Sequence, residues 1–170
     1  LDDRDIKLLI VGEIADGSEK EFHQQCIASG LAESIEMIDW LPIDEAMELV
    51  KTSHLGLILF QPDCHNHVHA LPHKLFDYMG AAVPVVVPQI AVEVVDIVTK
   101  SDCGLCIDTG SPEAIAAAIK EAKENRIVMV KKGKNGREAV FNDFNWEQEE
   151  ARLIQVYSGL SATRKTCRNC

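Results

Sequence analysis

LPHKLFDYMGAAVPVVVP, residues Leu71 to Pro88, is the stretch that decides the fold of this chain. Its first half has the apolar spacing of an amphipathic helix with Pro72 at the first helical position, where the missing N–H of proline removes no hydrogen bond. Its second half is an apolar run between two prolines, which is typical of a strand buried on both faces. A helix that leads directly into such a strand predicts a parallel sheet covered by helices.

The same alternation runs along the rest of the chain. We expect further strands over residues 6–12, 34–40, 55–62 and 104–109, with helices in the segments between and after them. This order predicts an α/β fold with a Rossmann-like, doubly wound parallel sheet and right-handed crossovers. With 170 residues and 46% hydrophobic content, we expect one domain over residues 1–158 and a polar, disordered tail over 159–170.

Composition excludes several classes of protein. The formal net charge is −10 and no run of Lys and Arg reaches five residues, so neither a nucleic-acid footprint nor an anionic-membrane footprint is visible. No apolar stretch approaches the roughly 20 residues of a membrane-spanning helix. The acidic start, LDDRDIKLL, does not resemble a signal peptide. We therefore expect a cytoplasmic protein.

Cysteine and histidine clusters are the candidate metal ligands. Two C-x-x-C pairs, Cys103 with Cys106 and Cys167 with Cys170, are too far apart for a zinc ribbon, and the second pair lies in the polar tail. Four histidines, at positions 65, 67, 69 and 73, would share a face if the segment is extended, as zinc or nickel requires. Only Asp63 and Cys64 stand nearby to complete a cage. We expect no physiological metal, and the role of the histidines stays open.

The helix that starts at Pro72 is the first candidate for a ligand site. In doubly wound sheets ligands bind beyond the carboxyl ends of the strands, where helix N-termini offer free N–H groups and a positive dipole end. A phosphate is the expected ligand there, and Asp77, one turn further on, can accept hydrogen bonds from sugar hydroxyls. The alternative is that Lys74 and Asp77 are only a solvated helix pair.

The segment P-H-K-L-F-D-Y-M-G-A-A-V-P-V-V-V, from Pro72 to Val87, resembles the P-x-K-L-F-E-Y-M-A-A-G-x-P-V-V signature of family 4 glycosyltransferases. These are retaining enzymes of the GT-B fold that transfer a sugar from a nucleotide donor. The resemblance extends over residues 6–158 and includes FNWEQEEARLIQVY, which is similar to the family's terminal W-E helix. It implies the C-terminal, donor-binding half of a GT-B protein.

The resemblance also assigns donor-binding residues: Trp40, Leu41, Pro42, His69, His73, Lys74, Leu75 and Asp77. Asp77 stands at the second glutamate of the family's E-x7-E motif, which holds the ribose, and His69 stands where the first acid would be. The amides of residues 73–75 would face the distal phosphate, Lys74 would help offset its charge, and residues 40–42 would cradle the base. No catalytic residue is assigned.

Three substitutions and one missing segment depart from the family pattern. Asp77 replaces a glutamate, Ala82 replaces the motif's glycine and Gly80 replaces an alanine. Family members also carry a further strand and helix before the strand at residue 6, with an arginine and a lysine that clamp the diphosphate, and an N-terminal acceptor domain. We expect these parts to belong to a longer chain or to a partner subunit, so that the isolated chain is inactive.

These features predict the donor-binding domain of a retaining glycosyltransferase that transfers a hexosyl unit to a glycan or lipid-linked acceptor, in polysaccharide or glycoconjugate biosynthesis. The expected donor is a UDP- or GDP-sugar, with no cofactor and no nucleic-acid partner. Contact with a membrane would be peripheral and made through the missing domain. The first alternative is a non-catalytic paralogue that binds a nucleotide or a partner chain. An FMN-binding, flavodoxin-like domain is disfavoured, because no serine-rich phosphate loop follows the first strand.

Overall fold

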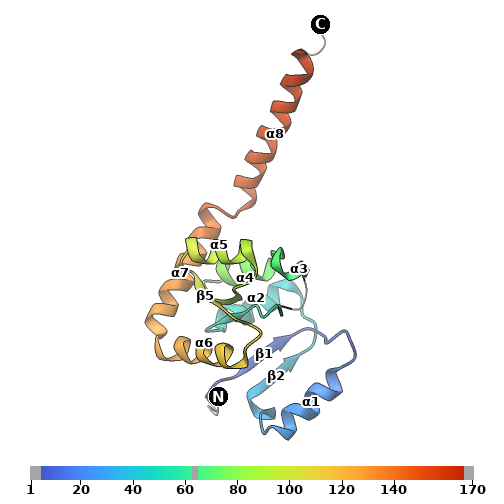
Figure 1. Cartoon of the computed structure of the whole chain (residues 1–170), viewed down its shortest axis with the longest axis vertical. Helices are drawn as coiled ribbons and strands as arrows, with labels where there is room; N and C mark the ends of the chain where they lie inside the picture. The colour runs from blue at the N-terminus through green and yellow to red at the C-terminus, as the bar shows by residue number, and fades with distance from the viewer. Residues whose placement is uncertain (1–4, 63–64, 167–170) are drawn as a thin grey trace. The chain divides into compact units, whose positions relative to one another are not determined.

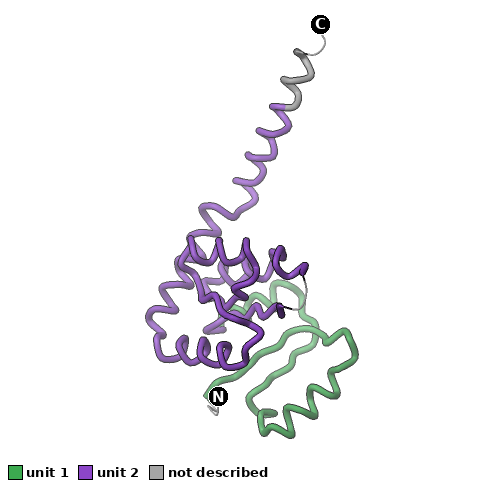
Figure 2. Tube along the Cα trace, in the orientation of Figure 1, with its two compact units in different colours: residues 1–52 green, residues 53–170 purple. Residues whose placement is uncertain are grey.

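The computed structural model describes residues 5–62 and 65–166, with side chains described as far as residue 159. The chain divides into two compact units, residues 1–52 and 53–170 (Figure 2). The strands form two separate sheets, one in each unit. No helix of the described residues is long and apolar enough to cross a membrane.

Unit 1 is a two-stranded parallel sheet with two α-helices. Its elements are, in chain order, β1 (Leu8–Val11), α1 (Glu19–Ala28), the 3-10 helix η1 (Ala32–Ser34), β2 (Ile35–Ile38) and α2 (Ile43–Thr52). Leu8 lies opposite Ile35 and Val11 opposite Ile38, and the N–H of Gly12 continues the ladder to the carbonyl of Ile38 at 2.9 Å. Among the described residues of this unit, Cys26 on α1 is the one that is fully buried.

Unit 2 contains a three-stranded parallel sheet in the order β3-β4-β5. Its elements are β3 (Gly56–Leu57), α3 (His65–Val68), α4 (His73–Gly80), β4 (Val85–Pro88), α5 (Val92–Lys100), β5 (Gly104–Ile107), α6 (Pro112–Glu124), α7 (Arg126–Asn142) and α8 (Trp146–Thr166) (Figure 1). Val85 lies opposite Gly56 on one side and Gly104 on the other. The predicted α/β class with parallel strands and covering helices is confirmed.

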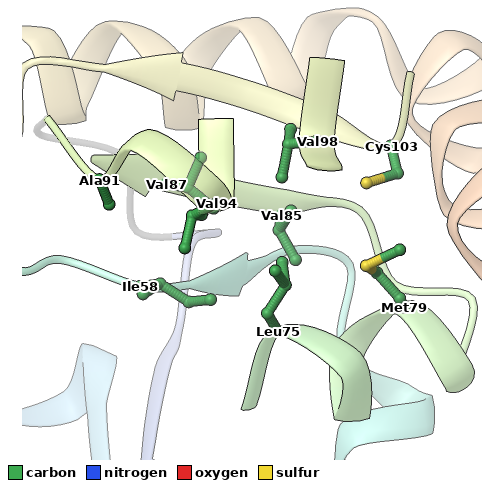
Figure 3. Packing of buried hydrophobic residues seen from close by; sticks show 9 residues of the cluster. All are labelled: Ile58, Leu75, Met79, Val85, Val87, Ala91, Val94, Val98 and Cys103. Atoms are coloured by element: carbon green, nitrogen blue, oxygen red, sulfur yellow. The ribbon is translucent and has the colours of Figure 1, made fainter. Parts of the chain in front are cut away.

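The core of the molecule surrounds β4. All four residues of this strand are buried, as the apolar run between prolines predicts. Leu75 and Met79 of α4 and Val94 and Val98 of α5 point toward the strand and belong to one buried cluster with Val85 (Figure 3). The segment that decides the fold in the sequence therefore also forms the centre of unit 2.

Helix α7 packs closely on the turn between α4 and β4. Two buried glycines, Gly133 and Gly136, allow this contact: a Cβ on Gly133 would collide with the carbonyl oxygen of Ala82, and one on Gly136 would lie 3.1 Å from the Cβ of Cys103. Ala82 itself has φ 60°, in the left-handed region where an L-residue other than glycine is strained. The family signature that this segment resembles has a glycine where this chain has Ala82. Glycine adopts this φ without strain, so the replacement by alanine strains the backbone of the turn.

Helix α8 is the last element of the described chain and continues through Thr166. Residues 146–166 contain no proline, and Gly159 is the one residue there with a strong preference against helix. Residues 167–170, including Cys167 and Cys170 of the second C-x-x-C pair, lie outside the described residues.

Candidate functional site

The N-terminus of α4 is the centre of the candidate site. The sequence predicts Pro72 as the first helical residue, whereas in the structure Pro72 is the N-cap, with extended backbone (φ −77°, ψ 139°). No side chain caps the helix. The N–H of Leu75 donates to the carbonyl of Pro72 at 3.1 Å, so one of the three amides assigned to phosphate already has a partner. For the N–H groups of His73 and Lys74 no hydrogen-bond partner is found among the described residues, and they remain available to an anion.

The side chains of α4 divide between the core and the solvent as predicted. Leu75 and Met79 are fully buried and Phe76 packs against Phe144 at 5.5 Å between ring centroids, whereas Lys74 is exposed and Asp77 is half-buried. No ion pair joins Lys74 to Asp77 among the described residues.

Tyr78 lies next to Asp77 and packs over the end of β3. Its ring occupies the space that a side chain at Gly56 would need. Burial raises the pKa of the Tyr78 hydroxyl above its ordinary value, the negative charge of Asp77 raises it further, and a hydrogen bond with the backbone of Leu57 opposes both. Tyr78 is therefore protonated and uncharged at physiological pH, so it places no second negative charge beside the Asp77 carboxylate.

A hydrogen-bonded network joins the carboxyl ends of β3 and β5. Thr109 is buried, with 4% of its surface exposed, and its hydroxyl donates to the carbonyl of Phe60. The side-chain amide of Gln61 donates to the carbonyls of Leu59 and Thr109, both at 3.2 Å. These bonds fix the two loops that leave the sheet on the side where α4 begins, which is the side where doubly wound sheets bind ligands.

His67 is held by the same network. Its Nδ1 lies 2.7 Å from the backbone carbonyl of Gln61, and its ring stacks on Phe60 with centroids 5.0 Å apart and an interplanar angle of 13°. Because a carbonyl only accepts, Nδ1 carries the proton and Nε2 is the acceptor in the neutral ring. The side chain is thus an oriented imidazole close in sequence to the start of α4.

The sequence analysis considers an extended histidine segment. In the structure, His65–Val68 instead form the short helix α3. Helical spacing brings the rings of His65 and His69 into edge contact at 5.6 Å between centroids, and His69 is exposed. Among the residues that the structure describes, no three His, Cys, Asp or Glu side chains are grouped so as to hold a metal. Asp63 and Cys64 lie outside that part of the chain.

The residues assigned to the base lie in unit 1, on the loop between β2 and α2. Trp40 has 71% of its surface exposed, Leu41 is half-buried, and the carbonyl of Pro42 accepts a hydrogen bond from the N–H of Ala46 at 3.0 Å in the first turn of α2. The other assigned residues, His69, His73, Lys74, Leu75 and Asp77, lie in unit 2.

Sequence reasoning missed Gln61, Thr109 and the particular role of His67. The available signal was the place of the polar residues: Gln61 directly follows the apolar run LILF, and Thr109 follows the strand GLCI by one residue. Polar side chains at the carboxyl ends of parallel strands are candidates for a site even when no motif includes them.

Parallel strands with covering helices, and a helix start at the carboxyl edge, are features of doubly wound α/β folds. Similarity to solved structures identifies the particular fold as that of the C-terminal domain of GT-B glycosyltransferases. The structure is similar to sucrose-phosphate synthase from Thermosynechococcus elongatus, with TM-score 0.76, 20% identity and coverage of 92% of this chain and 39% of that one. It is similar to Anabaena HepE solved in complex with UDP, with TM-score 0.78, 16% identity and coverage of 91% and 41%. It is also similar to the C-terminal domain of LpcC, a group 1 family glycosyl transferase from Francisella tularensis, with TM-score 0.69, 15% identity and coverage of 82% and 70%.

The sequence model of the family "Glycosyl transferases group 1" matches residues 1–139, and the chain belongs to this family. The chain spans about two fifths of the length of the first two solved structures that it matches. A comparison with curated proteins gives no match.

Proposed function

We propose that the chain is the nucleotide-sugar-binding part of a retaining family 4 glycosyltransferase, which transfers a hexosyl unit from a UDP- or GDP-sugar to a glycan or lipid-linked acceptor in polysaccharide or glycoconjugate biosynthesis. The observation that carries the proposal is the uncapped N-terminus of α4, where the N–H groups of His73 and Lys74 have no hydrogen-bond partner among the described residues, with Asp77 one turn further on. Anabaena HepE, a structural neighbour, has been solved with UDP and with UDP and glucose.

The residues of unit 2 take complementary roles in this proposal. The N–H groups of His73 and Lys74, the dipole of α4 and the Lys74 ammonium offset the negative charge that develops on the leaving diphosphate. Asp77 accepts hydrogen bonds from the ribose hydroxyls. The exposed imidazole of His69 and the free Nε2 of His67 face the sugar or its phosphate, and residues 40–42 of unit 1 cradle the base.

The remaining parts of the reaction belong to other segments. An acceptor domain, on a longer chain or on a partner subunit, supplies the acceptor site. A further strand and helix before the strand at residue 6 supply the basic residues that clamp the diphosphate, and the protein acts in the cytoplasm without a cofactor. Positioning of donor and acceptor then provides most of the rate enhancement.

A second candidate function is a non-catalytic module that binds a nucleotide or a partner chain. The observation in its favour is His69 at the place of the first acid of the E-x7-E motif, together with the strained Ala82 at the place of a glycine.

Calorimetric titration of the chain with UDP, GDP and their sugar conjugates tests the proposal. We expect one nucleotide to bind with a Kd up to about a millimolar. Asp77→Ala should weaken binding by about tenfold or more, the loss expected for hydrogen bonds to a charged group, and Asp77→Glu, which restores the family's residue, should retain it. The matched control is Asp96→Ala, an exposed aspartate on α5. Equal affinity of Asp77→Ala and Asp96→Ala would contradict the assignment of Asp77, and absence of binding by the unsubstituted chain would contradict the donor site.

A further inference from the structure

Helix α7 concentrates positive charge in an acidic protein. Five of the 17 Lys and Arg residues of the chain lie in this 17-residue helix, beside a single acid, Glu138, while the net charge of the whole chain is −10. The longest unbroken run of Lys and Arg in this helix is Lys131 with Lys132, because apolar, small and polar residues separate the other cations. Only the helical spacing brings them onto common faces.

The two faces of α7 are different. Met129, Gly133 and Gly136 are buried on the inner face. The outer face combines apolar and basic side chains, all of them exposed: Ile127, Val130, Lys131, Lys134, Arg137 and Phe141. We call this set the α7 outer face. Exposure reaches 88% for Ile127, 50% for Val130 and 64% for Phe141, and Figure 1 shows α7 along an edge of unit 2.

The cations of the outer face are available to a partner. In the described structure Lys131 and Lys134 form no ion pair, and the guanidinium of Arg137 lies over the ring of Phe141 at 5.5 Å. By contrast, Lys132 on the inner side pairs with Asp102, and Arg126 contacts His54 at 2.9 Å. Glu138 is the one acid that points the same way, so the face keeps a net positive charge.

We propose that the α7 outer face binds the surface of an anionic lipid bilayer. Ile127 and Phe141 stand at the two ends of the helix, about 21 Å apart at 1.5 Å per residue, with the cations between them. A helix lying in a bilayer interface has this arrangement: apolar side chains reach below the headgroups, while Lys and Arg extend to the phosphates. A protein partner would instead favour an apolar centre with a polar rim.

The acidity of the rest of the chain does not oppose this contact strongly. At physiological ionic strength the Debye length is about 8 Å, so a bilayer in contact with α7 responds mainly to the charges of this helix. Each Lys or Arg near an anionic surface strengthens binding by about fivefold. The α7 outer face shares no residue with the proposed donor site, so the proposal stands whether or not the chain binds a nucleotide.

Co-sedimentation of the full chain with vesicles tests the proposal. The probes are vesicles of phosphatidylcholine alone and of phosphatidylcholine with 30% phosphatidylglycerol, at low and at high salt. We expect binding to the anionic vesicles only, reduced by salt. The triple variant Lys131→Gln, Lys134→Gln, Arg137→Gln should lose at least tenfold in partition coefficient. The pair Ile127→Ser and Phe141→Ser should lose binding even at low salt.

The matched control removes the same charge from exposed positions elsewhere: Lys7→Gln, Lys20→Gln, Lys100→Gln. It should bind as the unsubstituted chain does, and circular dichroism should show the same helix content for all variants. Absence of vesicle binding, equal binding to both vesicle types, or equal loss in the control would overturn the proposal. Self-association of the chain that the α7 triple variant abolishes, without vesicle binding, would overturn it in favour of a second copy.

Discussion

The two units of the chain differ in how much apolar surface they bury. In unit 2 the central strand β4 is buried throughout, and α4 and α5 contribute Leu75, Met79, Val94 and Val98 to the same cluster. In unit 1 the strands β1 and β2 are half-exposed, and Cys26 is the one fully buried residue that the structure describes there. Because burial of apolar surface is the main favourable term in folding, stability resides in unit 2.

This difference matters for the candidate site. The helix start, Asp77 and the network of Gln61, His67 and Thr109 all belong to the unit with the packed core. The loop with Trp40, which is assigned to the base, belongs to the unit with few buried residues. We therefore expect the proposed phosphate and ribose contacts, which lie in unit 2, to be preorganised.

Matched leucine truncations should show the largest effect. Leu75→Ala in unit 2 removes a side chain with 0% exposure and should lower the free energy of unfolding by about 2–5 kcal/mol. Leu9→Ala in unit 1 removes a half-buried side chain and should cost about 1 kcal/mol. Urea denaturation followed by circular dichroism measures both. Equal losses in the free energy of unfolding would contradict the account, because they would mean that both units contribute equally to stability.

The close approach of α7 gives the next largest effect. Gly133→Ala would place a Cβ against the carbonyl of Ala82, so we expect a loss of about 1–3 kcal/mol in the free energy of unfolding. Gly80→Ala is the control, because a Cβ there meets nothing within 4 Å. It should be neutral or stabilising by up to about 1 kcal/mol. An unchanged free energy of unfolding in Gly133→Ala would mean that α7 packs loosely on the turn at Ala82.

The strained turn after α4 can be relieved. Ala82→Gly should raise the free energy of unfolding by about 0.5–1 kcal/mol, because Ala82 has φ 60° and glycine adopts this conformation without strain. At the neighbouring Ala81, where φ is −78°, the same change should destabilise by a similar amount. Thermal unfolding of the two variants measures the contrast, and a shift in the same direction for both would contradict the strain.

The smallest effect concerns alkaline pH. Burial raises the pKa of the Cys103 thiol from its ordinary 9.0 to about 11. The unfolded chain therefore loses this proton at a lower pH than the folded chain does. The contribution of the thiol to the free energy of unfolding is fully present below pH 9.0 and is lost as the pH rises to about 11. Stability measured by urea denaturation should fall over this range, and less steeply in Cys103→Ala. An unchanged slope in the variant would rule out Cys103 as the cause.

Much of the fold follows from local sequence patterns. The buried strand β4 and the amphipathic helix α4 are both predicted from the sequence, because apolar periodicity acts within a few residues. The separation into two sheets could not be predicted this way. It depends on which strands pair, and pairing joins residues far apart in the chain.

The site was predicted only where the family motif reaches. The motif directs attention to His73, Lys74 and Asp77, but it says nothing of Gln61 and Thr109, which are 48 residues apart in sequence and meet through a hydrogen bond. The close packing of Gly133 on Ala82 was missed for the same reason. Contacts between distant segments leave no pattern in a single sequence.

The measurement that tests the central claim most directly is a titration of the chain with UDP and GDP, followed by the backbone amide signals in NMR spectra. Our account predicts that one of these nucleotides gives its largest shifts at the amides of His73 and Lys74, with smaller shifts at Gln61 and His67 and at the Trp40 loop. The amide of Leu75, which is already bonded to Pro72, should move less. Shifts confined to other parts of the chain, or no shift at millimolar nucleotide, would contradict a donor site at the start of α4.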